Sequence, residues 1–185
     1  MTQSIHLSLD TMGGDYAPQI VIEGAAQSKI RYPNLKFSFF GNKDKIIPLI
    51  NSLEILKSSH VIHTDQIIDA NEKPSTAVRK GKNSSMGMAI QLVKSGKADA
   101  IVSAGNTGAL MAISKLILRP MDGITRPAIA AYFPTIVGES CMLDLGANIE
   151  CDEKNLIDFA ELGSALYKSL FPKDKPKVSL LNIGS

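Results

Sequence analysis

Short apolar runs alternate with segments of helical periodicity along much of this chain of 185 residues. The runs that predict strands are residues 5–9, 35–40, 60–64 and 98–103, and the segments that predict helices are residues 18–33, 43–53, 86–93 and 109–118. Strands of a parallel sheet are covered on both faces, so they read as short apolar runs rather than as alternating ones. Strands that alternate with helices are typical of the α/β class. The sequence therefore predicts an α/β fold with a mostly parallel sheet.

The later part of the chain continues in the same manner. Further strands are predicted at residues 128–133, 141–145 and 178–183, and the longest helix at residues 152–170. Residues 65–75 are polar and predict a loop. Because no linker, repeat or low-complexity tract divides the sequence, we expect a single α/β domain over residues 1–185.

Charge and composition exclude several classes of protein. Twenty basic and eighteen acidic residues give a net charge of +2, which is too balanced to indicate a nucleic-acid partner. The apolar runs are too short for a membrane span, and the first residues lack the pattern of a secretory signal. The two cysteines, Cys141 and Cys151, do not suggest a disulfide scaffold and fit a reducing compartment. We therefore expect a soluble, cytoplasmic protein.

Polar and glycine-rich loops follow four of the predicted strands. These loops are residues 10–15, 41–42, 103–108 and 144–148. In open α/β sheets ligands bind beyond the carboxyl ends of the strands, so we expect the loops to converge on one crevice. Glycine permits close approach of the backbone to a ligand, and a following helix offers unpaired N–H groups with partial positive charge. Such a site suits an anion, above all phosphate.

The loop at residues 103–108 is the best candidate, because it lies between a strand and a helix. Asn106 or Thr107 could contact the anion or could simply cap the helix. The glycine pair Gly13 and Gly14 lies between Asp10 and Asp15. These carboxylates could orient a nucleophile, coordinate a cation or fix the turn.

The sequence contains a basic cluster and lacks several standard motifs. Arg79, Lys80 and Lys82 form this cluster, which could be a solvated charged surface, and Arg79 or Lys82 could instead supply the cation that an anion site needs. There is no glycine fingerprint of a dinucleotide fold, no P-loop, no nucleophile elbow and no closely spaced His/Cys cluster. The sequence thus predicts neither a cofactor nor a metal ion.

Five motifs occur together in an order that resembles a known family. They are DTMGGDYAP at residues 10–18, KPSTAVR at 73–79, SSM at 84–86, SAGNTGALM at 103–111 and DLGAN at 144–148. Together they resemble the bacterial phosphate acyltransferases of phospholipid synthesis, and the similarity runs essentially from end to end. The resemblance implies a three-layer α/β/α sandwich, like those of phosphate acetyltransferases and isocitrate/isopropylmalate dehydrogenases.

The resemblance also implies a reaction and its partners. Inorganic phosphate would attack the thioester of a long-chain acyl group carried on acyl carrier protein, giving acyl phosphate without a cofactor. Members of the family are cytoplasmic, form homodimers and associate peripherally with the membrane.

Matching motifs carry site roles over to this sequence as expectations. The resemblance gives catalytic roles to Asn106, Asp15 and Asp144. It gives contacts with phosphate or substrate to Asp10, Gly13, Gly14, Arg79, Lys82, Ser103, Thr107, Gly108 and Asn148.

Thr11 stands where the family usually has alanine, and members of the family are considerably longer. The resemblance therefore implies that the chain is the N-terminal part of a longer architecture, and that a catalytic lysine follows Ser185. Two alternatives remain open. The chain could be a non-catalytic fragment that binds phosphate or carrier protein, or an NAD(P)-dependent dehydrogenase on the related fold.

Overall fold

The computed structural model describes residues 4–136, 138–172 and 175–182. The chain forms two compact units, Met1–Arg119 and Pro120–Ser185. The expectation of one domain over residues 1–185 stays a prediction.

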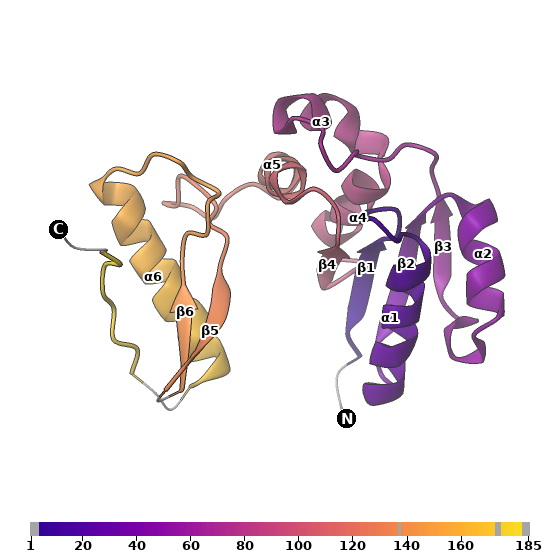
Figure 1. The fold of residues 1–185 in the computed structure, drawn as a ribbon, viewed down its shortest axis with the longest axis horizontal. Coiled ribbons are helices and arrows are strands. Elements are labelled where there is room, and N and C mark those ends of the chain that lie inside the picture. Colours follow the sequence, from indigo (N-terminus) through magenta and orange to yellow (C-terminus); the bar gives the residue numbers. More distant parts are fainter. Residues whose placement is uncertain (1–3, 137, 173–174, 183–185) are drawn as a thin grey trace. The chain divides into compact units, whose positions relative to one another are not determined.

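The first unit contains a four-stranded sheet in the order β3-β2-β1-β4 (Figure 1). Its strands are β1 (His6–Asp10), β2 (Lys36–Gly41), β3 (His60–His63) and β4 (Ala100–Ser103). All three neighbouring pairs are parallel, with Leu9 opposite both Phe39 and Val102. The sheet confirms the four strands expected in this part of the chain.

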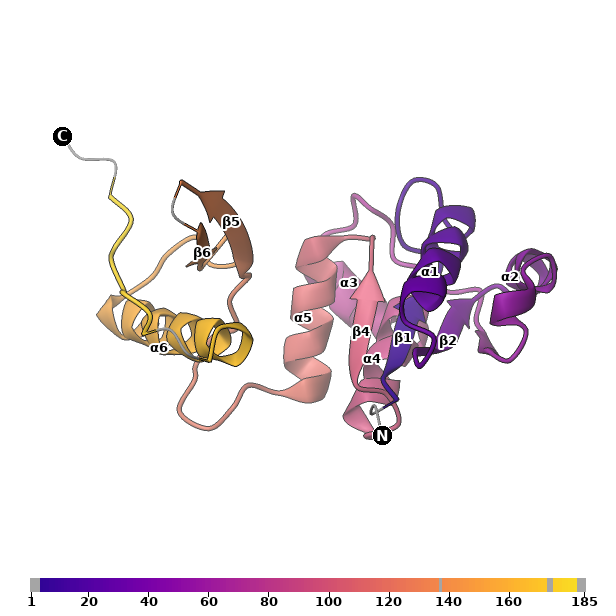
Figure 2. The same ribbon diagram turned by 90° about the horizontal axis from the view of Figure 1, so that it is seen from below.

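Helices cover both faces of this sheet, and Figure 2 shows α1 and α4 on opposite sides of β1. The helices of the unit are α1 (Gln19–Arg31), α2 (Lys43–Asn51), α3 (Pro74–Lys80), α4 (Ser85–Lys94) and α5 (Thr107–Leu118), with 3-10 turns η1 (Glu54–Leu56) and η2 (Gly81–Asn83). Successive side chains of a strand point to opposite faces. Leu9 accordingly joins the core formed with Ile22 of α1 and Ile46 of α2, whereas the Ser8 hydroxyl donates to the Ala89 carbonyl of α4 at 2.9 Å. The α/β/α layering is confirmed.

The second core of this unit lies among helices. Met86 and Ile90 of α4 pack with Ala77 of α3 and with Ala109 and Ile113 of α5. Helix α3 was not expected, because its sequence PSTAVRK has little apolar periodicity. Its fold follows from Pro74 at the first helical position and from Ala77, which is fully buried.

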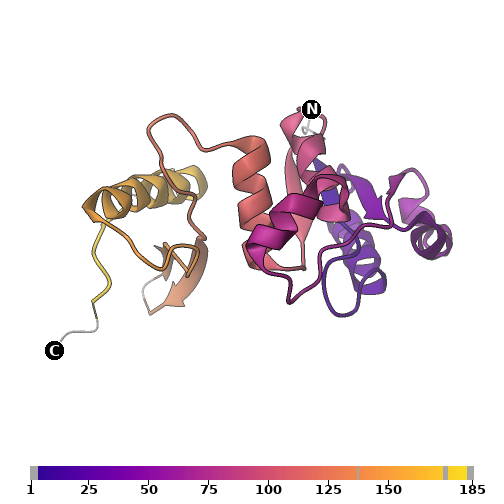
Figure 3. The same ribbon diagram turned by 90° about the horizontal axis from the view of Figure 1, so that it is seen from above.

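The second unit consists of a hairpin and a long helix. Strands β5 (Ala131–Thr135) and β6 (Gly138–Met142) pair antiparallel, with Tyr132 opposite Cys141. Too few residues separate them for the crossover that a parallel pair needs, so this pair departs from the expected parallel arrangement. Helix α6 (Glu153–Leu170), shown as one continuous helix in Figure 3, begins with a reciprocal capping box between Asp152 and Asn155.

The strand expected at residues 178–183 is wrong for its described part. Residues 178–182 have no strand structure, and Ile183 lies outside the described residues. Leu180 and Leu181 are 74% and 81% exposed. An apolar run becomes a strand only where another strand pairs with it, and none does so within the described residues.

No helix in the described part of the chain is long and apolar enough to cross a membrane.

Candidate functional site

The carboxyl ends of β1 and β4 bring two of the glycine-rich loops together. Asp10 and Ser103 are opposite each other at the ends of these strands. A Cβ at Gly13 would lie 2.9 Å from the Gly105 nitrogen and 2.6 Å from Oδ2 of Asp10. The φ of Gly14 is +103°, a conformation that side chains rarely adopt. The two backbones therefore approach as closely as they do only because glycine occupies both loops.

Asp10 is almost fully buried, at 2% exposure, beneath these loops. Its Oδ1 accepts a hydrogen bond from the Ser85 hydroxyl at 2.6 Å, and its Oδ2 accepts one from the Ser103 hydroxyl at 2.7 Å. The Ser103 oxygen in turn accepts from the Gly105 N–H at 3.1 Å. Of the roles considered for this carboxylate, fixing the loop is the one that its contacts support.

Asn106 ends the same loop and starts helix α5. Its Oδ1 accepts from the Ala109 N–H at 2.9 Å, which makes it the N-cap. Its Nδ2 donates to the carbonyls of Ala70 and Glu72, both at 2.9 Å, and to that of Asp69 at 3.3 Å. Both polar atoms of the amide are thus engaged, and they hold the segment before α3 against the start of α5.

The first turn of α5 keeps donors available. The N–H groups of Thr107 and Gly108 make no hydrogen bond within the described residues, as is usual for a first helical turn. They also carry the partial positive charge of the helix terminus. A Cβ at Gly108 would lie 3.0 Å from Cγ of Pro74, so α3 begins close beside these donors. Thr107 is exposed, and this turn can accept an anion.

Three of the charged residues expected at the site lie on the surface of the first unit. Asp15, Arg79 and Lys82 are exposed, and their side chains have no hydrogen bond or ion pair among the described residues. Lys80 lies 3.1 Å from a carboxylate oxygen of Glu72. Because α3 packs its Ala77 side toward α5, Arg79 belongs to a helix adjoining the loop site.

Asp144 and Asn148 lie in the second unit and bond locally. Oδ1 of Asp144 accepts from the Ile129 N–H at 2.7 Å, and its Oδ2 accepts from the Asn148 N–H at 2.7 Å. The Asn148 amide donates to the Pro127 carbonyl at 2.9 Å and to Asp144 at 3.1 Å. These contacts fasten the loop 144–148 to the segment before β5.

Sequence reasoning missed Ser85 as part of the site. Ser84 and Ser85 are adjacent in the sequence, and either residue type is suited to cap a helix such as α4. The structure gives the cap to Ser84, whose oxygen accepts from the Gly87 N–H at 3.1 Å. That leaves the Ser85 hydroxyl free to bond Asp10. The doubled serine was the available signal, but only a second structural partner distinguishes its two members.

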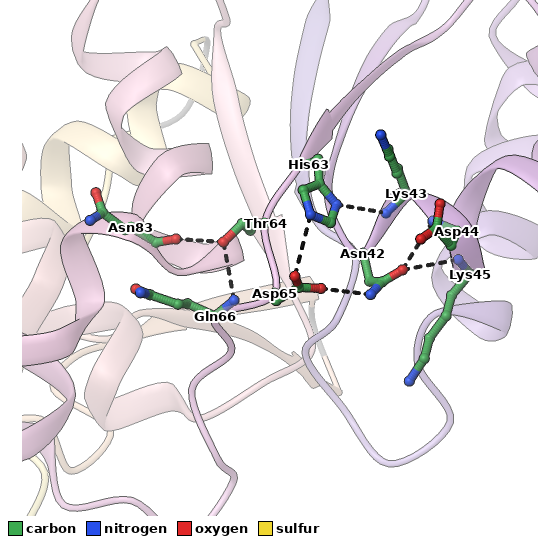
Figure 4. A network of polar contacts seen from close by, with 9 residues as sticks. All are labelled: Asn42, Lys43, Asp44, Lys45, His63, Thr64, Asp65, Gln66 and Asn83. Atoms are coloured by element: carbon green, nitrogen blue, oxygen red, sulfur yellow. Dashed lines mark hydrogen bonds and ion pairs between the residues drawn. The ribbon is translucent and has the colours of Figure 1, made fainter.

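A further polar network, also missed, lies at the carboxyl ends of β2 and β3 (Figure 4). Asn42 caps α2 and donates to Asp65 at 2.7 Å. Nδ1 of His63 accepts from the Lys43 N–H at 3.2 Å, and its Nε2 lies 3.4 Å from Asp65. The side chains of this network bond to one another and to the backbone N–H groups in the first turn of α2. The network therefore holds the ends of β2 and β3 to the start of α2.

Two other features bear on the chemistry of the chain. No group of three or more His, Cys, Asp or Glu side chains in the described ranges is placed to hold a metal ion. In the second unit, burial raises the pKa of Tyr132 above its usual value of 10.0, and the neighbouring Cys141 thiol adds to the shift.

The fold of the chain is of the α/β class and is similar to that of a phosphotransacetylase of known structure. The EutD phosphotransacetylase from Staphylococcus aureus superposes with a TM-score of 0.64 at 18% identity, covering 91% of this chain and 54% of that one. This likeness shows the fold, and it confirms the expected resemblance in fold to the phosphate acetyltransferases.

Sequence comparison identifies the family. Residues 5–185 match the family described as "Fatty acid synthesis protein", and the chain belongs to that family. A phosphate acyltransferase from Rhodospirillum centenum is 47% identical over 186 residues, which cover 100% of this chain and 52% of that protein. One from Rhizobium meliloti is 49% identical over 182 residues, covering 97% and 52%. The resemblance to bacterial phosphate acyltransferases is thereby confirmed, and the chain spans about half the length of the curated relatives it matches.

Proposed function

We propose that this chain forms the phosphate-binding part of an acyltransferase that makes acyl phosphate from long-chain acyl-[acyl-carrier-protein] and inorganic phosphate for phospholipid synthesis. One observation carries the proposal: the free N–H groups of Thr107 and Gly108 at the start of α5, beside the close approach of Gly13 and Gly105. Family membership supports the same reaction.

The proposed reaction needs no covalent bond between the substrate and the protein. A phosphate oxygen attacks the thioester carbonyl carbon, a C–O bond forms, and the C–S bond breaks with its electron pair going to sulfur. The proton lost by phosphate ends on the released thiol. Because thiolate is a good leaving group, no enzyme nucleophile is needed, and positioning the two reactants can supply most of the acceleration. Backbone donors would stabilise the charge that grows on the carbonyl oxygen.

The contacts refine the roles that the motifs suggested. We assign the phosphate donors to the backbone of Thr107 and Gly108, with Gly13 and Gly14 leaving room for the anion. Asn106 acts by holding the turn, since its amide hydrogens are already donated to carbonyls.

The remaining carboxylates and Asn148 are assigned by their surroundings. We assign to Asp15, which is exposed and follows Gly14 in the chain, the role of accepting the proton from phosphate. Asp144 and Asn148 order the loop 144–148 of the second unit.

The exposed surface of α3 and η2 is the proposed docking site for acyl carrier protein. Acyl carrier protein is acidic, and the exposed cations Arg79 and Lys82 attract such a partner over distances comparable to the Debye length. Family resemblance further supports a cytoplasmic homodimer that associates peripherally with the membrane, and these properties belong to the whole protein.

The test is to incubate the purified chain with palmitoyl carrier protein and labelled phosphate and to measure acyl phosphate, alongside a phosphate titration. Phosphate binding with turnover supports the enzyme. Binding without turnover supports the non-catalytic fragment instead. Absence of both contradicts the proposal, and binding of a nicotinamide cofactor would favour a dehydrogenase.

A further inference from the structure

A buried chain of hydrogen bonds joins three elements of the first unit to the loop before α5. It runs from Ser85 at the first position of α4, through Asp10 at the end of β1, to Ser103 at the end of β4 and then to the Gly105 N–H. Ser85 and Asp10 are each 2% exposed. The three bonds measure 2.6, 2.7 and 3.1 Å.

The direction of each hydrogen follows from the groups involved. Both serine hydroxyls donate to the carboxylate oxygens of Asp10. Each hydroxyl has a single hydrogen, so the Ser103 oxygen meets the Gly105 N–H with a lone pair. Ser103 then has no hydrogen left for a bound anion, and its contribution is to fix the turn at Gly105.

Ser85 is the end of this chain that anchors it in the core. Its backbone N–H donates to the Gln66 carbonyl at 2.9 Å, which sets the position of its side chain. Its neighbour Ser84 is equally buried but bonds only within its own turn, to the Gly81 carbonyl and the Gly87 N–H. The two serines are adjacent and both buried, at 1% and 2% exposure, yet among the described residues only Ser85 is connected to the loop.

We propose that Ser85 is a positioning residue for the anion site. Its hydroxyl fixes the rotation of the Asp10 carboxylate, Asp10 fixes Ser103, and Ser103 sets Gly105 so that the N–H groups of Thr107 and Gly108 face the anion. The phosphate part of this inference rests on the proposed function. The ordering of Gly105 does not.

Removing the Ser85 hydroxyl leaves the Oδ1 atom of Asp10 without its hydrogen-bond donor. A buried carboxylate oxygen that loses its donor remains desolvated without compensation. Asp10 can then turn toward another donor, and the Ser103 hydroxyl is no longer held. The Gly105 N–H, which donates to the Ser103 oxygen, is then the first loop group whose hydrogen bond weakens.

The experiment compares Ser85→Ala with the matched control Ser84→Ala in the full chain. Amide hydrogen exchange is measured at Gly105, and the affinity for inorganic phosphate is measured by titration. Ser85→Ala is expected to speed Gly105 exchange and weaken phosphate binding, each by about tenfold. Ser84→Ala is expected to destabilise α4 while leaving both readouts within about twofold.

A conservative variant separates the hydroxyl from the space it occupies. Ser85→Thr keeps the donor and is expected to restore both readouts. If Ser85→Ala does not fold, Ser85→Cys retains a weak donor of similar size and is expected to give an intermediate loss in both.

Equal behaviour of Ser85→Ala and Ser84→Ala at Gly105 overturns the inference. If the unmutated chain binds no phosphate, the proposed function fails, and the exchange readout still decides on Ser85. Fast exchange at Gly105 only in the Ser85 variant supports the positioning role, and unchanged exchange contradicts it.

Discussion

The paired loops of the first unit and the loop 144–148 of the second unit contain the same residue types but use them differently. In the first unit, the carboxylate of Asp10 is held by hydroxyls from two other elements, and the first turn of α5 keeps free donors. In the second, Asp144 and Asn148 bond each other and the backbone beside them. The difference teaches that a glycine, asparagine and aspartate loop marks a binding site only where some of its donors stay unused.

The largest effect is expected from Gly13→Ala. The new Cβ would collide with Asp10 and with the Gly105 backbone, neither of which can move freely. We expect a loss of about 1–3 kcal/mol in the free energy of unfolding together with loss of phosphate binding. Urea unfolding and a phosphate titration measure both quantities.

Gly24→Ala is the matched control for that change. Gly24 lies within α1 and has no atom within 4 Å of its would-be Cβ, so alanine should stabilise the helix by up to about 1 kcal/mol. Equal tolerance of alanine at both glycines would contradict the close approach of the two loops.

Asn106→Ala is expected to have the next largest effect on phosphate binding. It removes the cap of α5 and the bonds to residues 69–72, so phosphate affinity and acyl phosphate formation should fall about tenfold. Asn42→Ala is the control, because Asn42 caps α2 in the same way. Both variants should lose about 1 kcal/mol of stability, but only the first should weaken phosphate binding.

Asp144→Ala tests the other side of the comparison. Its carboxylate accepts from two backbone N–H groups, so its loss should destabilise the second unit by about 1.5–3 kcal/mol. Hydrogen exchange at Ile129 and Asn148 should rise, whereas phosphate affinity should change less than in Asn106→Ala. A larger loss of phosphate affinity than in Asn106→Ala would show that this loop binds the anion.

A smaller effect is expected when both Arg79 and Lys82 are changed to alanine. Affinity for acyl carrier protein should fall several-fold at low salt and converge with the unmutated chain at high salt. The control changes Arg31 and Lys97, which are exposed and carry the same total charge elsewhere. If both double variants bind carrier protein equally at low salt, α3 is not its docking surface.

The smallest effect concerns Tyr132 in the second unit. Burial raises its pKa in the folded state, so the neutral phenol is favoured there. The stability this contributes is complete below pH 10.0 and is lost as the pH rises through the raised pKa. Tyr132→Phe should remove that loss, which unfolding measured at increasing pH above neutrality would show.

Strands β1 and β2 could be predicted because they are buried on both faces and their own apolar residues show that burial. Phe39 and Phe40 show this directly, since adjacent side chains of a strand point to opposite faces and these two are 0% and 3% exposed. The strand expected at 178–183 shows the limit, because pairing depends on a neighbour and not on the run itself. Helix α3 was not predicted because its own residues show little apolar periodicity. It forms where Ala77 packs against other helices, which the local sequence does not show.

In the candidate site, too, some features could be predicted from the local sequence and others depend on residues far away in the chain. That polar loops follow the strands is visible in the sequence, and so is the choice between cap and contact at Asn106. Which choice holds depends on the carbonyls of residues 69–72, which lie more than thirty positions away. Ser85 likewise acquires its role from Asp10, 75 positions earlier in the chain.

The most direct test of the account is a titration of the isotope-labelled chain with inorganic phosphate, following backbone amides by NMR. The account predicts saturable shifts of the Thr107 and Gly108 amides, with smaller shifts at Gly13 and Gly14. Shifts confined to the loop 144–148, or no saturable shift at α5, would contradict it.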